Sequence, residues 1–127
     1  MQERKLFEYA VIRVMPRVER GEFMNVGVVL YCASQKFLQV RFIINGSRLT
    51  ACCADVDLAE LEKRLHVFDR ICQGDKAAGP IALLPIASRF RWLTATKSTV
   101  VQTSAVHPGL CIDPETEIDK LFKKLVE

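Results

Sequence analysis

The chain has 127 residues, of which half are apolar and 26% are charged, and this predicts a single globular domain over residues 1–127. The composition excludes a chain that is disordered throughout. The formal net charge of +3 is too small to indicate nucleic-acid binding by itself, because many small proteins carry as much charge for solubility alone.

The cysteines and the apolar runs indicate the compartment. The five cysteines are Cys32, Cys52, Cys53, Cys72 and Cys111. They are odd in number and form no C-x-x-C pair, which fits a reducing cytosol best. The N-terminal stretch is interrupted by Glu8 and Arg13 and is no signal peptide. The longest apolar run, Val26 to Ala33, is far shorter than the roughly 20 residues of a membrane helix. We therefore expect a cytoplasmic protein that contacts no membrane.

The first part of the chain predicts three strands. Phe7 to Met15 is rich in β-branched and aromatic residues and ends at Pro16. Val26 to Ala33 is almost entirely apolar, as expected for a central strand covered on both faces. Ser34-Gln35 gives a reversal into Phe37 to Ile44, so these two runs predict a hairpin. Asn45-Gly46 is a turn pair suited to positive φ.

A helix is predicted over Leu58 to Gln73. Its apolar residues recur at three- and four-residue steps and line one face, and they are Leu58, Leu61, Leu65, Phe68 and Cys72. Asp57 with Glu60 resembles a capping box, and Gly74 is a natural stop.

The rest of the chain predicts two further helices and a strand. Gly74 to Pro85 contains two glycines and two prolines and is expected to be irregular. Ile86 to Leu93 predicts a short helix and Thr99 to Thr103 a fourth strand. Asp113-Pro114 is an N-cap followed by proline, the start of a final helix. The order predicts an α+β fold, with a mainly antiparallel sheet of about four strands and two or three helices packed on one face.

Six segments, spread over nearly the whole chain, resemble one known family. They are residues 9–14, 19–23, 25–30, 89–94, 98–102 and 106–111. Together they are similar to the bacterial family DUF3037, whose name declares an unknown function. The resemblance implies genes that often lie beside one for a HipA-like kinase, and hence a role as its partner or regulator. It supplies no established catalytic residues.

Arg89-Phe-Arg-Trp92 alternates cations with aromatic side chains, a combination that can bind phosphate and stack a base. The alternative is that its aromatic residues anchor the segment in the core while the arginines pair with carboxylates. If the segment turns back against the strand that contains Gln102, the sequence predicts an anion site formed by Arg89, Arg91, Gln102 and His107.

His107 and Cys111 are a second candidate pair, because an imidazole can activate a thiol. Pro108-Gly109 between them predicts a loop, which would have to bring the two together. The alternative is a structural role in which Cys111 is buried. A metal site is not expected, since His66, Cys52 and Cys53 lack convergent spacing.

Secondary candidates lie in and around the connection before the central strand. Glu19 to Asn25 is a polar cluster that includes Arg20, although a charged turn is usually just solvated. The full set of secondary candidates is Arg20, Asn25, Trp92 and Cys111. Gly27, inside the apolar strand, predicts a bulge or a close approach by Trp92 or a helix.

Three classes of function remain open. The chain contains no P-loop, G-x-G-x-x-G or G-x-S-x-G pattern, so no cofactor is expected. We expect a non-catalytic interaction or regulatory partner, with a HipA-like kinase as the partner that the resemblance implies. The alternatives are a nucleic-acid or nucleotide binder that uses the Arg89 to Trp92 segment and a cysteine-dependent enzyme centred on Cys111.

Overall fold

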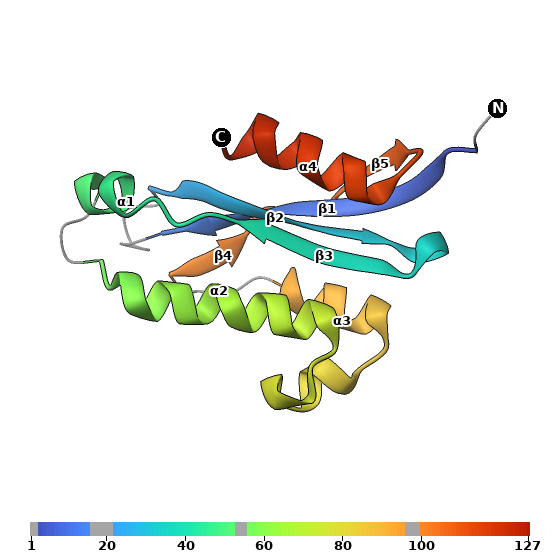
Figure 1. The fold of residues 1–127 in the computed structure, drawn as a ribbon, viewed down its shortest axis with the longest axis horizontal. Helices are drawn as coiled ribbons and strands as arrows, with labels where there is room; N and C mark the ends of the chain where they lie inside the picture. The colour runs from blue at the N-terminus through green and yellow to red at the C-terminus, as the bar shows by residue number, and fades with distance from the viewer. Residues whose placement is uncertain (1–2, 16–21, 53–55, 96–99) are drawn as a thin grey trace.

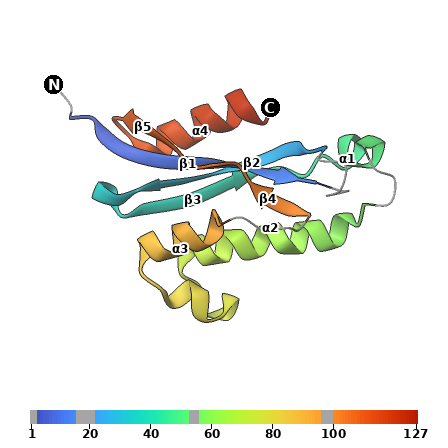
Figure 2. The same ribbon diagram turned by 180° about the vertical axis from the view of Figure 1, so that it is seen from behind.

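The computed structural model describes residues 3–15, 22–52, 56–95 and 100–127. An antiparallel sheet runs through the centre of the molecule, with helices on both of its faces (Figure 1). Seen from behind, the same three layers are evident (Figure 2). The α+β class with an antiparallel sheet is therefore confirmed.

The sheet has five strands. They are β1 (Lys5–Val14), β2 (Met24–Cys32), β3 (Phe37–Phe42), β4 (Val101–Thr103) and β5 (His107–Cys111). The order is β3-β2-β1-β4, and β5 also pairs with β1, along its N-terminal half. The sequence predicts the first four strands but not β5, because Pro108-Gly109 reads as a loop. Proline is tolerated there because β5 is an edge strand, whose outward side needs no donor.

Gly27 lies where the ladder between β1 and β2 is irregular. The register shifts between Ile12, opposite Gly27, and Arg13, opposite Asn25, which confirms the predicted bulge. A Cβ atom on Gly27 would lie 2.6 Å from the Arg41 carbonyl oxygen and 2.9 Å from the Phe42 Cβ. The close approach therefore comes from β3, and the expectation that Trp92 or a helix makes it is wrong.

Two helices cover one face of the sheet. The helix α2 (Leu58–Gln73) begins at Asp57, whose side chain accepts a hydrogen bond from the Glu60 amide, and ends at Gly74 with φ +73°. The helix α3 (Ile86–Leu93) follows two short 3₁₀ turns and buries Phe90 and Leu93. Both helices have the predicted bounds, because their apolar spacing and caps are local signals.

A short helix, α1 (Gly46–Cys52), follows β3. The Asn45 side-chain oxygen accepts a hydrogen bond from the Arg48 amide at 3.1 Å, as an N-cap residue does. Positive φ angles occur at Lys36, Gly74 and Gly79 among the described residues. The prediction of a positive-φ turn at Asn45-Gly46 is therefore wrong, since the pair begins a helix instead.

The last helix, α4 (Pro114–Leu125), lies on the face opposite α2 and α3 (Figures 1 and 2). Ile118 of α4 packs with Val28, Leu30 and Phe7, whereas Leu65 of α2 packs with Val29 and residues on the other face. The expectation that the helices pack on one face is wrong. Because β2 is buried on both sides, its two faces each need apolar cover.

Candidate interaction surface

The two arginines of the Arg89 to Trp92 segment both have partners within the protein. Arg89 donates from Nη1 to the carbonyl oxygens of Ile71 and Cys72, both at 2.9 Å, and from Nε to Leu84 at 3.0 Å. These carbonyls include the last turn of α2, where the helix dipole favours a cation. Arg89 is therefore a C-terminal cap of α2.

Arg91 forms a two-pronged ion pair with Glu8 of β1. Its Nη1 and Nη2 donate to the two carboxylate oxygens, each at 2.9 Å, and this hydrogen bonding raises the pKa of Arg91. The pair is the bidentate geometry that arginine forms with carboxylates. Trp92, next to it in α3, is exposed, while Phe90 and Leu93 are fully buried.

Gln102 and His107 lie on the face of the sheet opposite Arg91. Gln102 is paired with Arg13 and His107 with Tyr9, whereas Arg91 contacts Glu8, and alternate residues of one strand point to opposite faces. The His107 ring lies 5.5 Å from the Tyr9 ring. The four residues predicted to form an anion site therefore do not come together in one cluster.

His107 and Cys111 are the two ends of β5. Four residues along a strand separate them by roughly 13 Å, which is far beyond hydrogen-bond reach. Burial raises the pKa of the Cys111 thiol, and the neighbouring Cys32 and Glu117 raise it further. Cys111 is 4% exposed. The geometry therefore supports the structural reading of Cys111 and gives no thiolate-imidazole pair.

The remaining secondary candidates are Asn25 and Arg20. Asn25 donates from Nδ2 to the Leu125 carbonyl at 3.1 Å, so it holds the C-terminal end of α4 against β2. Its Oδ1 is buried without a partner, as is the Nε of Arg13, which is opposite it in the ladder. Arg20 lies outside the described residues.

An apolar patch lies on the N-terminal half of β1 and on β5, which pairs with it. Leu6 and Leu110 are directly opposite each other in the ladder and are 62% and 58% exposed. Ile112, two residues beyond Leu110, is 49% exposed. We refer to Leu6, Leu110 and Ile112 as the apolar patch. Isolated exposed leucines are common, but adjacent ones mark contact surfaces.

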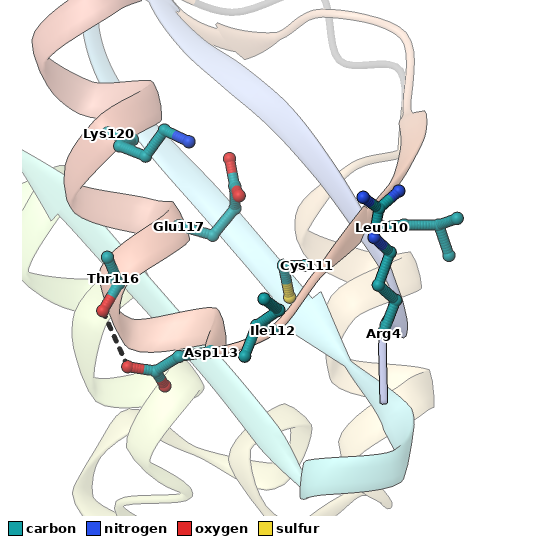
Figure 3. Close-up of a pocket in the computed structure, with 8 residues that line it drawn as sticks. All are labelled: Arg4, Leu110, Cys111, Ile112, Asp113, Thr116, Glu117 and Lys120. Atoms are coloured by element: carbon teal, nitrogen blue, oxygen red, sulfur yellow. Dashed lines mark hydrogen bonds between the residues drawn. The ribbon is translucent and has the colours of Figure 1, made fainter. Parts of the chain in front are cut away.

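Beside this patch is a groove of about 520 Å³ between β5 and the start of α4. Figure 3 shows Glu117 and Lys120 of α4 on one side and Arg4 on the other, with the Leu110 side chain pointing away from α4. Within it the Thr116 hydroxyl donates to Asp113 at 2.7 Å and lowers the pKa of that carboxyl. Asp113 is thereby engaged in capping α4. The groove presents both charge signs beside exposed apolar side chains, which is the composition of a contact surface.

Sequence reasoning missed this surface because it missed β5. The sequence holds no alternation that could have found it, because Leu6 is followed by apolar Phe7 and Leu110 and Ile112 flank apolar Cys111. Only the pairing of β1 with β5 shows that Leu6 and Leu110 are neighbours. No group of three or more histidine, cysteine or acidic side chains that could hold a metal ion occurs among the residues described.

The fold and this surface define a small α+β protein with an exposed apolar patch. The chain belongs to the family described as protein of unknown function (DUF3037), whose model matches residues 9–126. No curated protein and no solved structure matches the chain. In the part of the chain that the structure describes, no helix is both long and apolar enough to cross a membrane.

Proposed function

We propose that this protein is a non-catalytic, cytoplasmic interaction protein that docks a partner protein on the apolar patch of Leu6, Leu110 and Ile112. The exposure of Leu6 and Leu110, which are opposite each other in the ladder, and of Ile112 two residues farther on is the observation that carries the proposal. Burying them against a partner gains about 25 cal/mol per Å² of apolar surface removed from water. The adjoining groove adds Arg4, Glu117 and Lys120, which suit the polar rim of an interface.

The state of the candidate chemical groups supports an interaction role over catalysis. Arg89 and Arg91 are engaged by backbone carbonyls and by Glu8. The Cys111 thiol is buried with a raised pKa, and His107 is at the far end of the same strand. Nothing in this arrangement favours an enzyme, and the engaged arginines do not favour a nucleic-acid site at the Arg89 to Trp92 segment.

The partner we propose is the HipA-like kinase that the family resemblance implies. The test is co-purification and titration calorimetry of the two proteins, with the native chain and with Leu110→Asp. Because Leu110 is exposed, this change should leave the fold intact while placing a charge in the centre of the contact. We expect the native chain to bind at micromolar concentration and Leu110→Asp to bind at least tenfold more weakly, the loss expected at the centre of an interface.

Leu83→Asp is the matched control, because Leu83 is 63% exposed and lies in the 3₁₀ turn after α2. It should bind as the native chain does. No binding by the native chain at micromolar concentration would rule out this kinase as the partner. Equal binding by the Leu110 and Leu83 variants would show that the apolar patch is not the contact.

A further inference from the structure

The strand β3 is the outer strand of the sheet at the edge opposite β5, as far as the described residues go. Its register with β2 pairs Val28 with Arg41, and the Ile43 amide donates to the Val26 carbonyl at 2.9 Å. Backbone groups alternate in direction along a strand, so the odd-numbered residues of β3 bond to β2. The amides and carbonyls of Leu38, Val40 and Phe42 therefore point outward, away from the sheet.

This edge differs from the one at β5. There Pro108 removes a donor from the edge strand, which is one of the ways in which proteins block unwanted strand pairing. The β3 segment Phe37–Phe42 contains no proline and no bulge in its register with β2. The outward Val40 carbonyl accepts a hydrogen bond from the Arg41 Nη1 at 3.3 Å, and an incoming amide can replace that side chain. No further strand pairs with this edge among the residues that the structure describes.

A groove of about 440 Å³ lies along this edge, between β3 and α2. Leu38 and Val40 line it from the strand, and Asp69 and Gln73 line it from the helix. At the other end the Phe42 and His66 rings are 5.5 Å apart. The helix and the strand thus run alongside each other in opposite directions, as Figures 1 and 2 also show. A strand added to β3 would have α2 beneath it.

From the helix side this groove carries one carboxylate, Asp69, and a second, Glu62, lies farther along the same flank of α2. Glu62, His66, Asp69 and Gln73 follow one another at three- and four-residue steps, so they form one row on the flank of α2. His66 is the partner of Glu62, with 3.6 Å between Nε2 and the carboxylate. The two carboxylates of the row are separated by seven residues, or about 10 Å along the helix. Arg41 also lines the groove, from β3, but its charge is paired with Asp119 at 3.3 Å.

We propose that β3 and α2 bind an extended peptide segment of a partner that carries lysine or arginine at alternate positions. The segment adds to the sheet as a sixth strand. Its main chain bonds to the outward groups of Leu38, Val40 and Phe42, and its basic side chains, all on one face, meet Glu62 and Asp69. This is strand addition, in which the backbone supplies affinity and alternate side chains supply specificity. The surface lies at the opposite edge from the apolar patch and is independent of it.

The probe for this proposal is a fluorescent eight-residue peptide of alternating lysine and valine, with its glutamate and valine counterpart for comparison. Anisotropy should show the lysine peptide binding, the glutamate peptide failing to bind, and affinity falling as salt is added. Hydrogen exchange read by NMR should slow at the Leu38 and Val40 amides on peptide addition. The Gln39 and Arg41 amides, which face β2, should change little.

Two charge reversals test whether peptide binding depends on the groove or on the overall charge of the protein. Asp69→Lys should weaken binding of the lysine peptide at least tenfold. Glu127→Lys, the same charge change at the exposed end of the chain, should alter it less than twofold. N-methylation of the lysine peptide at its two central residues keeps every charge. It removes one amide N–H that would point toward β3, whichever way the peptide runs along the strand, so this peptide should not bind.

Several results would overturn the proposal. These are no binding of the lysine peptide at millimolar concentration, equal effects of the two charge reversals, or undiminished binding of the methylated peptide. Unchanged exchange at Leu38 and Val40 during binding would also overturn it. Sedimentation of the protein alone tests the rival occupant: a dimer in which the Leu38 and Val40 amides are already protected would show that a second copy covers this edge.

Discussion

Replacing Arg89 by methionine tests whether this arginine is a structural cap or a group available to ligands. Arg89 is half-buried, and its guanidinium joins the end of α2 to the turn before α3. Methionine keeps much of the aliphatic stem but removes all three hydrogen bonds. The Ile71 carbonyl retains the Gly74 amide as a partner at 3.1 Å, whereas Cys72 and Leu84 lose the Arg89 donor.

The magnitude follows from these contacts. A hydrogen bond to a charged group is worth about 1.5 to 3 kcal/mol, and a cation at a partly buried helix C-terminus up to about 2 kcal/mol. These contributions overlap, and water reaches the Leu84 carbonyl, so we expect Arg89→Met to lower the free energy of unfolding by about 2 to 4 kcal/mol. Arg89→Lys keeps the charge but not the planar guanidinium with its several N–H donors, and we expect it to lower the free energy of unfolding by an intermediate amount.

Urea denaturation followed by circular dichroism measures this loss from the shift in midpoint at constant slope. Arg91→Met is the matched control from the same helix. Arg91 is 58% exposed and its ion pair with Glu8 lies at the surface, so its removal should cost no more than about 1 kcal/mol. If the Arg89 and Arg91 variants were equally stable, the capping role assigned to Arg89 would be refuted.

Three further predictions concern the core and one thiol. Leu65→Ala should lower the free energy of unfolding by about 2 to 5 kcal/mol because Leu65 is fully buried, whereas Glu62→Ala should lower it little because Glu62 is exposed. Equal melting temperatures of the two variants would contradict the assignment of which face of α2 is buried. Gly27→Ala should destabilise the protein by about 1 to 3 kcal/mol, since the new methyl meets the Arg41 carbonyl, and a native urea midpoint would contradict this contact. Burial raises the pKa of Cys72 from 9.0 to about 12, so between these values the unfolded chain releases a proton that the folded protein keeps. The contribution of this thiol to the free energy of unfolding should therefore be fully present below pH 9 and should fall above it, by up to about 1.4 kcal/mol per pH unit. Between pH 8 and 10 the urea midpoint of Cys72→Ala should fall less steeply than that of the native protein.

The sequence by itself determined the elements whose signals are local. The bounds of α2 follow from Asp57, Gly74 and the spacing of its apolar residues, and the start of α4 follows from Asp113-Pro114. The run Val26 to Ala33 likewise indicated a strand buried on both faces, and β2 is such a strand. Each of these features depends on neighbours a few residues away, and such neighbours are visible in a single chain.

The tertiary structure alone decided which surfaces meet. The apolar stripe of a helix must pack against a sheet face, but the sequence of the helix does not determine which face. The structure places α4 on the face opposite α2 and α3. Strand β5 exists because β1 supplies its ladder, and its sequence contains a proline and a glycine that argue against a strand. The ladder between β1 and β5 places Leu6 opposite Leu110. The ladders of β1 with β4 and β5 also place Gln102 and His107 on the face of the sheet away from Arg91. Long-range pairing fixes which side chains share a face, and no local pattern encodes it.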